Sequence, residues 1–291
     1  MSGPILEVEQ VEVTFGGIKA IQDVSFAVEP EEFFAIIGPN GAGKTSMLNV
    51  LNGVYRPSRG DMRFEGRSLL GMAPPQVAAL GIARTFQNLA LFDEMNVLDN
   101  VVFGRHHFMR SGVLSGGLWF GRARDEEKAA RVDCLPLLEL MGLMDIRDRT
   151  VRDLPYGVKK RIELARALAM KPKLLLLDEP VAGLNASESR ELAQWVLTAK
   201  RQLGLTVVMI EHDMALVREF ADRVLVLDFG RVITCERPEE AIADPRVVRA
   251  YVGGSGDDLI ADLLGGQNIS EQPDGGPDEP RTGPAEKGAR A

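Results

Sequence analysis

The chain has 291 residues, 45% of them hydrophobic, and a formal net charge of -8 at pH 7. This composition is typical of a folded globular protein of one large or two ordinary domains, and the acidic balance argues against nucleic acid as a partner. The longest apolar runs are much shorter than the roughly 18 residues that span a bilayer, and residues 1–11 lack the basic start and apolar core of a secretion signal. We therefore expect a cytoplasmic protein that does not cross a membrane by itself.

The first strong motif follows an apolar run. Phe33–Ile37 predicts a buried strand and Lys44–Leu51 predicts a helix. The turn between them fits the pattern G-x-x-x-x-G-K-[ST], with the residues Gly38, Pro39, Asn40, Gly41, Ala42, Gly43, Lys44 and Thr45. Glycines let successive backbone N–H groups face phosphates, and the helix that begins near Gly43 directs the positive end of its dipole toward them. The Lys44 ammonium and the Thr45 hydroxyl suit the outer phosphates and Mg2+, so the sequence predicts a P-loop.

The middle of the chain has a different pattern. From about residue 88 to residue 153 it predicts helices, interrupted by a glycine-rich loop at 111–121, and gives no strand signal. Strands and helices alternate before and after this stretch, which favours a mainly parallel sheet with helices on its faces. We expect 88–153 to be a helical subdomain inserted into that core.

Two carboxylates end the next predicted strand. Leu174–Leu177 is apolar and is followed by Asp178 and Glu179. Such a strand delivers one carboxylate to a magnesium ion and the next to an attacking water molecule. Phosphoryl transfer needs positioning and charge stabilisation more than covalent chemistry, so a metal, a cation and a carboxylate form a sufficient core. The sequence predicts a nucleotide-hydrolysing site.

The last third of the chain predicts a strand, a hairpin and a polar tail. Thr206–Ile210 predicts a strand, and Asp228-Phe229-Gly230 predicts the turn between strands at 223–227 and 231–234. Residues 254–291 contain eight acidic and three basic side chains, and twelve of these 38 residues are Gly or Pro. This composition predicts a disordered tail. The apolar residues of Asp257–Leu264 lie at helical spacing, which leaves a short docking turn open as an alternative.

These motifs, in this order, resemble the ATP-binding subunits of ABC transporters over nearly all of residues 5–253. The resemblance implies the α/β fold of a P-loop NTPase core in residues 1–253, with a mainly parallel sheet, an N-terminal antiparallel β part and the inserted helical subdomain. ATP and Mg2+ are the implied ligands. By resemblance, Phe15 stacks on adenine, Gln87 contacts magnesium and water, His212 contacts the terminal phosphate, and Ala20 and Ser46 complete the nucleotide contacts.

The resemblance also divides the site residues by role. The catalytic residues it implies are Lys44, Gln87, Glu179 and His212. The implied magnesium ligands are Thr45, Gln87 and Asp178.

Two sequences compete for the family's signature, which completes the nucleotide site of a second subunit. Leu114–Gly117 has the usual letters but no following helix, whereas Leu154–Val158 opens a helix about twenty residues before Asp178. We favour the second because its position is right, and we expect Gly157 to offer its N–H to the opposite nucleotide. Pro155 replaces the usual Ser, which removes one hydrogen bond to the phosphate and predicts slow hydrolysis. The loop 182–185 corresponds to the family's dimer contact.

Three stretches narrow the choice of transporter. Residues 84–97, 112–118 and 244–253 resemble the LivG-type subunits of branched-chain amino acid importers. The implied partners are transmembrane permease subunits, a second ATP-binding subunit in a homo- or heterodimer, and indirectly a substrate-binding protein outside the membrane. The implied location is the inner face of the cell membrane, as a peripheral subunit.

Other functions remain open at this point. Close relatives transport urea, short amides or aromatic acids, so the cargo rests on resemblance. A soluble ABC ATPase acting on ribosomes or DNA usually has two cassettes or a long coiled-coil insert, and this chain has neither. A third alternative is a protein that binds nucleotide without hydrolysing it. The presence of Glu179 and His212 argues against this alternative, whereas Pro155 in the signature leaves it possible.

Overall fold

Six strands form the central sheet of the computed structural model, which describes residues 3–85, 90–105 and 122–252. Their order is β10, β9, β3, β8, β7, β6, and neighbours run parallel except for the antiparallel pair β9 and β10. The strands are β3 (Phe33–Ile37), β6 (Ile82–Arg84), β7 (Leu174–Asp178), β8 (Thr206–Ile210), β9 (Arg223–Asp228) and β10 (Arg231–Glu236). The predicted mainly parallel sheet is confirmed.

Side chains of β3 alternate between apolar layers on the two faces of this sheet. Phe34 and Ile36 pack in the same cluster as the buried residues of helix α1 (Lys44–Leu51). Ala35 and Ile37 belong to a different cluster, which contains residues of the C-terminal helices. Because successive strand residues point to opposite faces, a continuous apolar run is the expected sequence for a strand covered on both sides.

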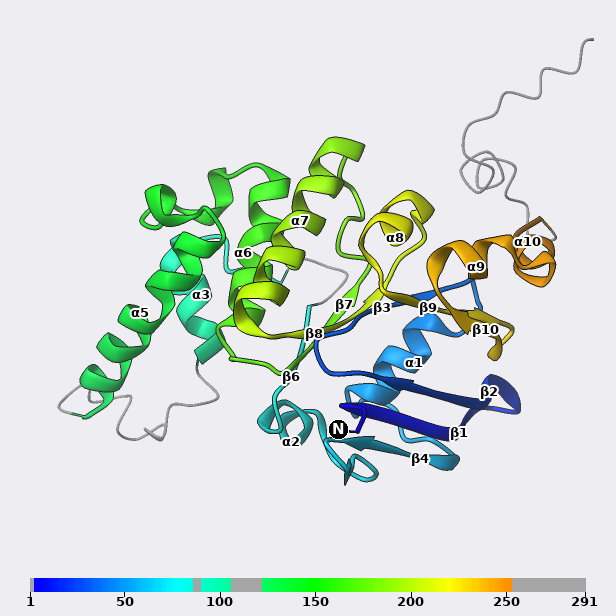
Figure 1. The fold of residues 1–291 in the computed structure, drawn as a ribbon. Coiled ribbons are helices and arrows are strands. Elements are labelled where there is room, and N and C mark those ends of the chain that lie inside the picture. Colours follow the sequence, from blue (N-terminus) through cyan, green and yellow to red (C-terminus); the bar gives the residue numbers. More distant parts are fainter. Residues whose placement is uncertain (1–2, 86–89, 106–121, 253–291) are drawn as a thin grey trace, which may run out of the picture.

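A second, antiparallel sheet covers the other side of α1, in the order β2, β1, β4, β5. It consists of β1 (Leu6–Phe15), β2 (Ile18–Val28), β4 (Arg59–Phe64) and β5 (Arg67–Ser68), and the short helix α2 (Pro74–Ala79) follows it. Figure 1 shows α1 between the two sheets, and one apolar cluster joins all three layers. The predicted N-terminal antiparallel part is confirmed.

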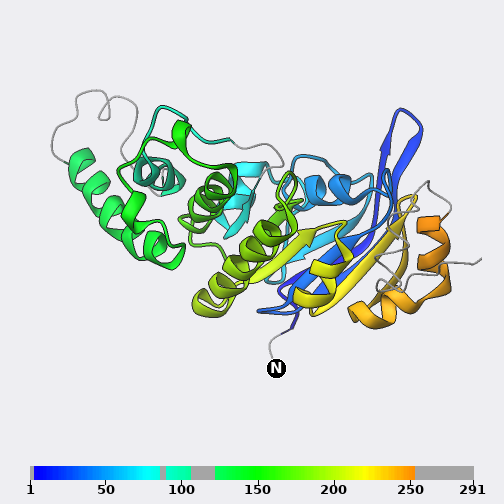
Figure 2. The ribbon, with the colours of Figure 1, turned by 90° about the horizontal axis from the view of Figure 1, so that it is seen from above.

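Helices gather at one end of the molecule, away from the second sheet, as Figures 1 and 2 show. They are α3 (Val97–Phe103), α5 (Arg122–Leu140) and α6 (Tyr156–Leu168), with the short 3-10 turns η2 (Met144–Ile146) and η3 (Val151–Asp153). Of these, α3, α5, η2 and η3 lie in the described parts of the predicted 88–153 insert. An isolated bridge joins Asn96 to Thr150, so the two ends of the insert meet.

The remaining helices are α7 (Ala186–Leu203), α8 (Met214–Phe220), α9 (Pro238–Ala243) and α10 (Pro245–Val252). The beginning of α7 is fixed by a capping box, in which Asn185 accepts from the Glu188 N–H and the Glu188 carboxylate accepts from the Asn185 N–H. Gly204, with φ of 63°, ends α7 in the left-handed conformation. No helix within the described ranges is long and apolar enough to cross a bilayer.

The predicted hairpin around residues 228–230 is also confirmed, since β9 and β10 pair antiparallel across it. Helix α6 begins at Tyr156, three residues before the expected start at Lys159. Pro155 occupies the N-cap position with φ of -55°, which proline adopts without strain. The predicted tail 254–291, the sequence Leu114–Gly117 and Gln87 lie outside the described residues.

Candidate functional site

The turn between β3 and α1 has a backbone that requires glycine. Gly38, Gly41 and Gly43 have φ of 150°, 81° and 101°. A Cβ atom at Gly38 would stand 2.1 Å from the Leu227 carbonyl oxygen, and one at Gly43 would stand 2.6 Å from that of Ala20. Neighbouring backbone thus lies too close to Gly38 and Gly43 for any side chain, so only glycine fits at these two positions.

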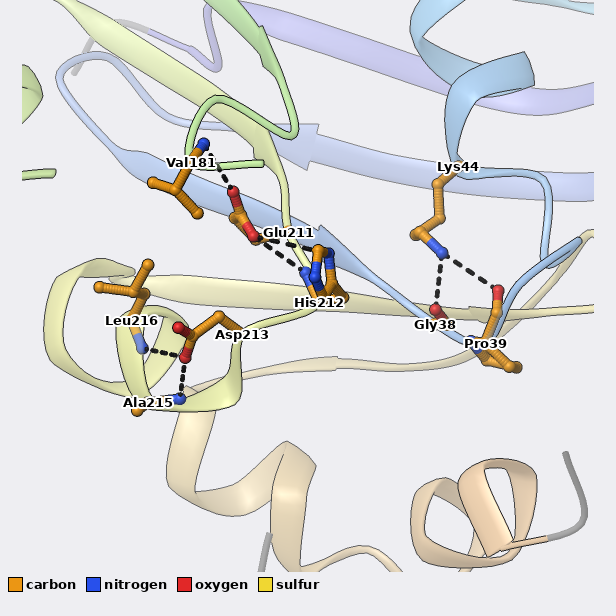
Figure 3. A network of polar contacts seen from close by, with 9 residues as sticks. All are labelled: Gly38, Pro39, Lys44, Val181, Glu211, His212, Asp213, Ala215 and Leu216. Carbon is orange, nitrogen blue, oxygen red and sulfur yellow. Dashed lines mark hydrogen bonds and ion pairs between the residues drawn. The ribbon is translucent and has the colours of Figure 1, made fainter. Parts of the chain in front are cut away.

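Lys44 is the first residue of α1, and its side chain folds back over the turn. Its Nζ donates to the carbonyl oxygens of Gly38, at 2.6 Å, and Pro39, at 3.1 Å, as Figure 3 shows. Burial lowers the pKa of Lys44, and the nearby carboxylates of Glu179 and Asp178 oppose this shift. The turn thus holds a buried cation within reach of two acidic groups.

A cavity of about 440 Å3 opens in front of this turn. Its walls include most of the predicted phosphate-site residues, namely Ala20, Asn40, Gly41, Ala42, Gly43, Lys44, Thr45, Ser46 and Glu179. The volume is typical of sites for small molecules. Residues 20, 40–46 and 179 are thus brought together at one site, although they come from three separate parts of the chain.

The two carboxylates after β7 have different surroundings. Asp178 is 3% exposed and forms an ion pair with Arg84, at 2.7 Å between Nη2 and Oδ2. Arg84 also donates to Asn49. Glu179 is half-buried on the cavity wall with φ of 46°, and its N–H donates to the Ile210 carbonyl oxygen. A carboxylate residue in the left-handed region is uncommon, and such strain concentrates at functional sites.

His212 follows β8 and has an exposed side chain above a buried carboxylate. Glu211 is 0% exposed, and its Oε2 accepts from the His212 N–H at 3.1 Å while its Oε1 faces the Val181 N–H at 3.5 Å (Figure 3). The His212 ring nitrogen Nδ1 lies 3.8 Å from Glu211. Burial raises the pKa of Glu211, and the neighbouring His212 opposes the rise. Glu211 therefore anchors the backbone that carries His212.

Several predicted site residues do not line this cavity. Phe15 ends β1, is 44% exposed and packs edge-on against Tyr55, with ring centroids 4.9 Å apart. Neither His212 nor Asp178 is among the residues that line the cavity, and Gly157 lies on α6. The expected role of Gly157 at the nucleotide of a second subunit stays a prediction.

The beginning of α6 is packed against the loop 182–185. The Tyr156 hydroxyl donates to the Ala182 carbonyl oxygen at 3.4 Å. A Cβ atom at Gly157 would stand 3.8 Å from the Leu184 side chain. The predicted signature and the predicted dimer-contact loop thus form one surface.

Sequence reasoning missed five residues around the site. Arg84 could have been found, because the carboxyl ends of the neighbouring parallel strands β6 and β7 meet at one sheet edge. The other four residues line the cavity from β2 and from the hairpin turn, and no local sequence pattern indicated that they would lie at a nucleotide site. They are Ile18, Lys19, Gln22 and Phe229.

Oxygen ligands for magnesium are present at this site. Thr45 lies on the cavity wall, and the Asp178 carboxylate lies close enough to Lys44 to affect its pKa. Within residues 3–85, 90–105 and 122–252 there is no cluster of three or more His, Cys, Asp or Glu that could hold a metal. This donor set fits Mg2+, which protein sites usually hold with one or two side chains plus phosphate oxygens and water.

The fold and the P-loop define an ATP-binding cassette, and comparison with known proteins agrees. A profile of the ABC transporter family matches residues 21–182. The chain is 38% identical over 253 residues to the high-affinity branched-chain amino acid transport ATP-binding protein LivG of Salmonella typhimurium, covering 87% of this chain and 99% of that protein. BraF of Pseudomonas aeruginosa, which has the same description, is 36% identical over the same shares of the two chains.

A solved structure supports the same assignment. The ADP conformation of MJ1267, an ATP-binding cassette of an ABC transporter, superposes with a TM-score of 0.76 at 30% identity and covers 86% of this chain and 99% of that one. The chain belongs to the ABC transporter family, as one of its ATP-binding, ATP-hydrolysing subunits.

Proposed function

We propose that this chain drives the import of branched-chain or related amino acids by hydrolysing ATP. One observation carries the catalytic part: Lys44, Thr45 and Glu179 face one cavity in front of the P-loop. The similarity to LivG and BraF along almost their full length supports the cargo class. The ATPase subunit does not touch the cargo, so the residues of the cavity do not determine it.

The cavity residues suit phosphoryl transfer. The N–H groups of residues 40–46 and the Lys44 ammonium bind the phosphates and stabilise their charge. Glu179 orients the attacking water molecule and accepts its proton. Thr45, Asp178 and Gln87 are the proposed ligands of Mg2+, which when bound neutralises charge on the phosphates. His212, exposed at the end of β8, contacts the terminal phosphate.

A second ATP-binding subunit completes the site. In the proposed dimer, the Gly157 N–H of one subunit faces the nucleotide on the other, and the loop 182–185 forms the contact between them. Pro155 lacks the hydroxyl that would add a hydrogen bond, so we expect slow turnover of each site. Phe15 is the proposed adenine contact on β1.

The proposed partners are permease subunits that cross the membrane and a substrate-binding protein that acts through them. The chain would sit as a peripheral subunit on the cytoplasmic face. We expect no contact with nucleic acid, in agreement with the net charge of -8.

The Glu179→Gln variant tests the catalytic assignment. It keeps the size of the side chain and the P-loop, so ATP binding should stay near the wild-type level. Hydrolysis should fall by about a hundredfold or more, which is the usual contribution of a general base. Equilibrium binding and phosphate release measure the two effects, and hydrolysis at the wild-type rate would remove Glu179 from the mechanism.

Transport by the reconstituted complex tests the cargo. The chain is assembled in vesicles with the permeases that co-purify with it and their substrate-binding protein. Leucine uptake should require ATP and should stop in the Glu179→Gln variant. ATP-dependent uptake of urea or a short amide in place of leucine would assign the other cargo class.

A further inference from the structure

We propose that Phe229 is a nucleotide-contact residue, whose ring forms an apolar wall for the nucleoside part of ATP. This inference rests on the proposed ATP site. Phe229 is 79% exposed, and it lines the same cavity as Lys44 and Glu179. A large exposed aromatic side chain at the rim of a small-molecule cavity is a typical ligand contact.

The backbone at Phe229 is strained. Its φ is 43°, in the left-handed region, where a bulky residue is a clear outlier. The turn connects β9 and β10, and two-residue hairpin turns that need positive φ usually have Asn or Asp before Gly. Phenylalanine does not favour positive φ as Asn and Asp do, and its exposed ring adds no buried apolar surface to the hairpin. The hairpin alone therefore does not explain a phenylalanine at this position.

Hydrogen bonds fix this turn to the P-loop and to β2. The Gly230 N–H donates to the Ala42 carbonyl oxygen at 2.9 Å, and the Gln22 N–H donates to the Gly230 carbonyl oxygen at 2.7 Å. The Gln22 side-chain amide donates to the Phe229 carbonyl oxygen at 2.9 Å. A Cβ atom at Gly230 would stand 2.5 Å from the Ala20 carbonyl oxygen. The main chain of the turn is thus held in place while the ring stays exposed.

The cavity wall offers both polar groups and apolar surface, the two kinds of contact that a nucleotide needs. Residues 40–46 and Glu179 supply N–H groups, a cation and a carboxylate for the phosphates and the water molecule. Ile18, which is 74% exposed, and Phe229 supply apolar surface. Among the described residues, Phe229 is the aromatic side chain on this cavity wall. The apolar part therefore suits the uncharged ribose and base.

Two variants and two ligands test this contact. Phe229→Asn removes the ring and tolerates positive φ, and Phe229→Tyr keeps the ring. Binding of MgATP and of inorganic tripolyphosphate with magnesium is measured by calorimetry on the full chain. Phe229→Asn should weaken ATP binding about three- to tenfold, as expected for one aromatic contact, and should leave tripolyphosphate binding unchanged. Phe229→Tyr should bind ATP within about twofold of wild type.

Controls separate this inference from the site on which it rests. Lys44→Ala should weaken both ligands, because it removes the phosphate cation. If Lys44→Ala leaves the binding of both ligands unchanged, the proposed ATP site is wrong, and the proposed Phe229 contact is then wrong as well. If Lys44→Ala behaves as expected but Phe229→Asn leaves ATP binding unchanged, or weakens both ligands equally, the contact alone is overturned. Melting temperatures check that each variant is folded.

Discussion

At the scale of single residues, the ion pair between Arg84 and Asp178 connects the fold to the site. Their side chains are 7% and 3% exposed, and Nη2 and Oδ2 are 2.7 Å apart. A buried carboxylate is tolerated because a cation neutralises it. Arg84 therefore balances the charge of the Asp178 carboxylate and holds it at the end of β7, where it is a proposed metal ligand.

Replacing Arg84 with methionine should be strongly destabilising. The variant leaves the buried Asp178 carboxylate without its cation, at a cost of about 3 to 5 kcal/mol in the free energy of unfolding. Chemical denaturation measures this loss. The matched double variant, Arg84→Met with Asp178→Asn, removes both charges and should recover most of the stability. A loss of less than about 1 kcal/mol in the single variant would show that the pair does not stabilise the fold.

A second residue, Glu211, should make the stability depend on pH. Burial raises its pKa above the ordinary value of 4.5, so its carboxyl keeps a proton to higher pH in the folded chain than in the unfolded one. The stability that this gives is complete below the unfolded pKa and is lost as pH rises through the folded pKa.

Glu211→Gln tests this dependence, because the amide does not titrate. The stability of wild type relative to the variant should fall as pH rises above the ordinary Glu pKa of 4.5 and through the raised pKa of the folded chain. The amide also loses one oxygen acceptor for the Val181 or His212 N–H, but that cost does not vary with pH. Denaturant unfolding at several pH values gives the difference, and a difference that rises with pH would contradict the assignment.

At the scale of elements, the sequence predicted the strands and helices that are marked by patterns of neighbouring residues. Phe33–Ile37 and Lys44–Leu51 are bounded by glycine patterns, and both segments occur as predicted. The strand β6 was missed because three residues carry too little periodicity. The Arg84–Asp178 pair and the contact of the 228–230 turn with the P-loop join residues far apart in sequence, so local patterns contain no signal for them.

The start of α6 is the element on which the proposed dimer depends. Tyr156 and Gly157 pack on the loop 182–185, so the signature and the dimer contact should move together. Gly157→Glu places a carboxylate where the opposite phosphates would bind, and like charges repel. We expect it to abolish ATP-dependent dimerisation, measured in a Glu179→Gln background, while ATP binding by the monomer stays near normal.

The competing signature sequence provides the control. Gly117→Glu introduces the same charge in Leu114–Gly117 and should leave dimerisation and hydrolysis almost unchanged. If Gly117 proves essential and Gly157 dispensable, the assignment of the signature is wrong. Pro155→Ser restores the usual hydroxyl, which is worth at most about 1.5 to 3 kcal/mol as a hydrogen bond to a charged group, so turnover should hold or rise.

At the scale of the whole molecule, the described apolar core extends into the last helix, α10 (Pro245–Val252). The three clusters of buried residues run from Leu6 to Tyr251, and the last helix, α10, contributes Val247 and Tyr251 to one of them. Tyr251 is 3% exposed, so this helix is part of the folded core. The tail 254–291, with eight acidic and three basic side chains, carries most of the net negative charge of the chain and few large apolar residues.

Deleting residues 254–291 should therefore leave the melting temperature and the affinity for ATP close to their wild-type values. The matched control ends the chain at Asp244 and also removes α10, with the buried side chains of Val247 and Tyr251. Burying a side chain of this size is worth about 1.5 to 3 kcal/mol, and each kcal/mol shifts the melting temperature of a domain of this size by about 2 to 4 °C. The longer deletion should thus lower the melting temperature by several degrees, whereas the shorter one should not. A similar fall in both variants would place the tail within the folded core and would move the domain boundary beyond residue 253.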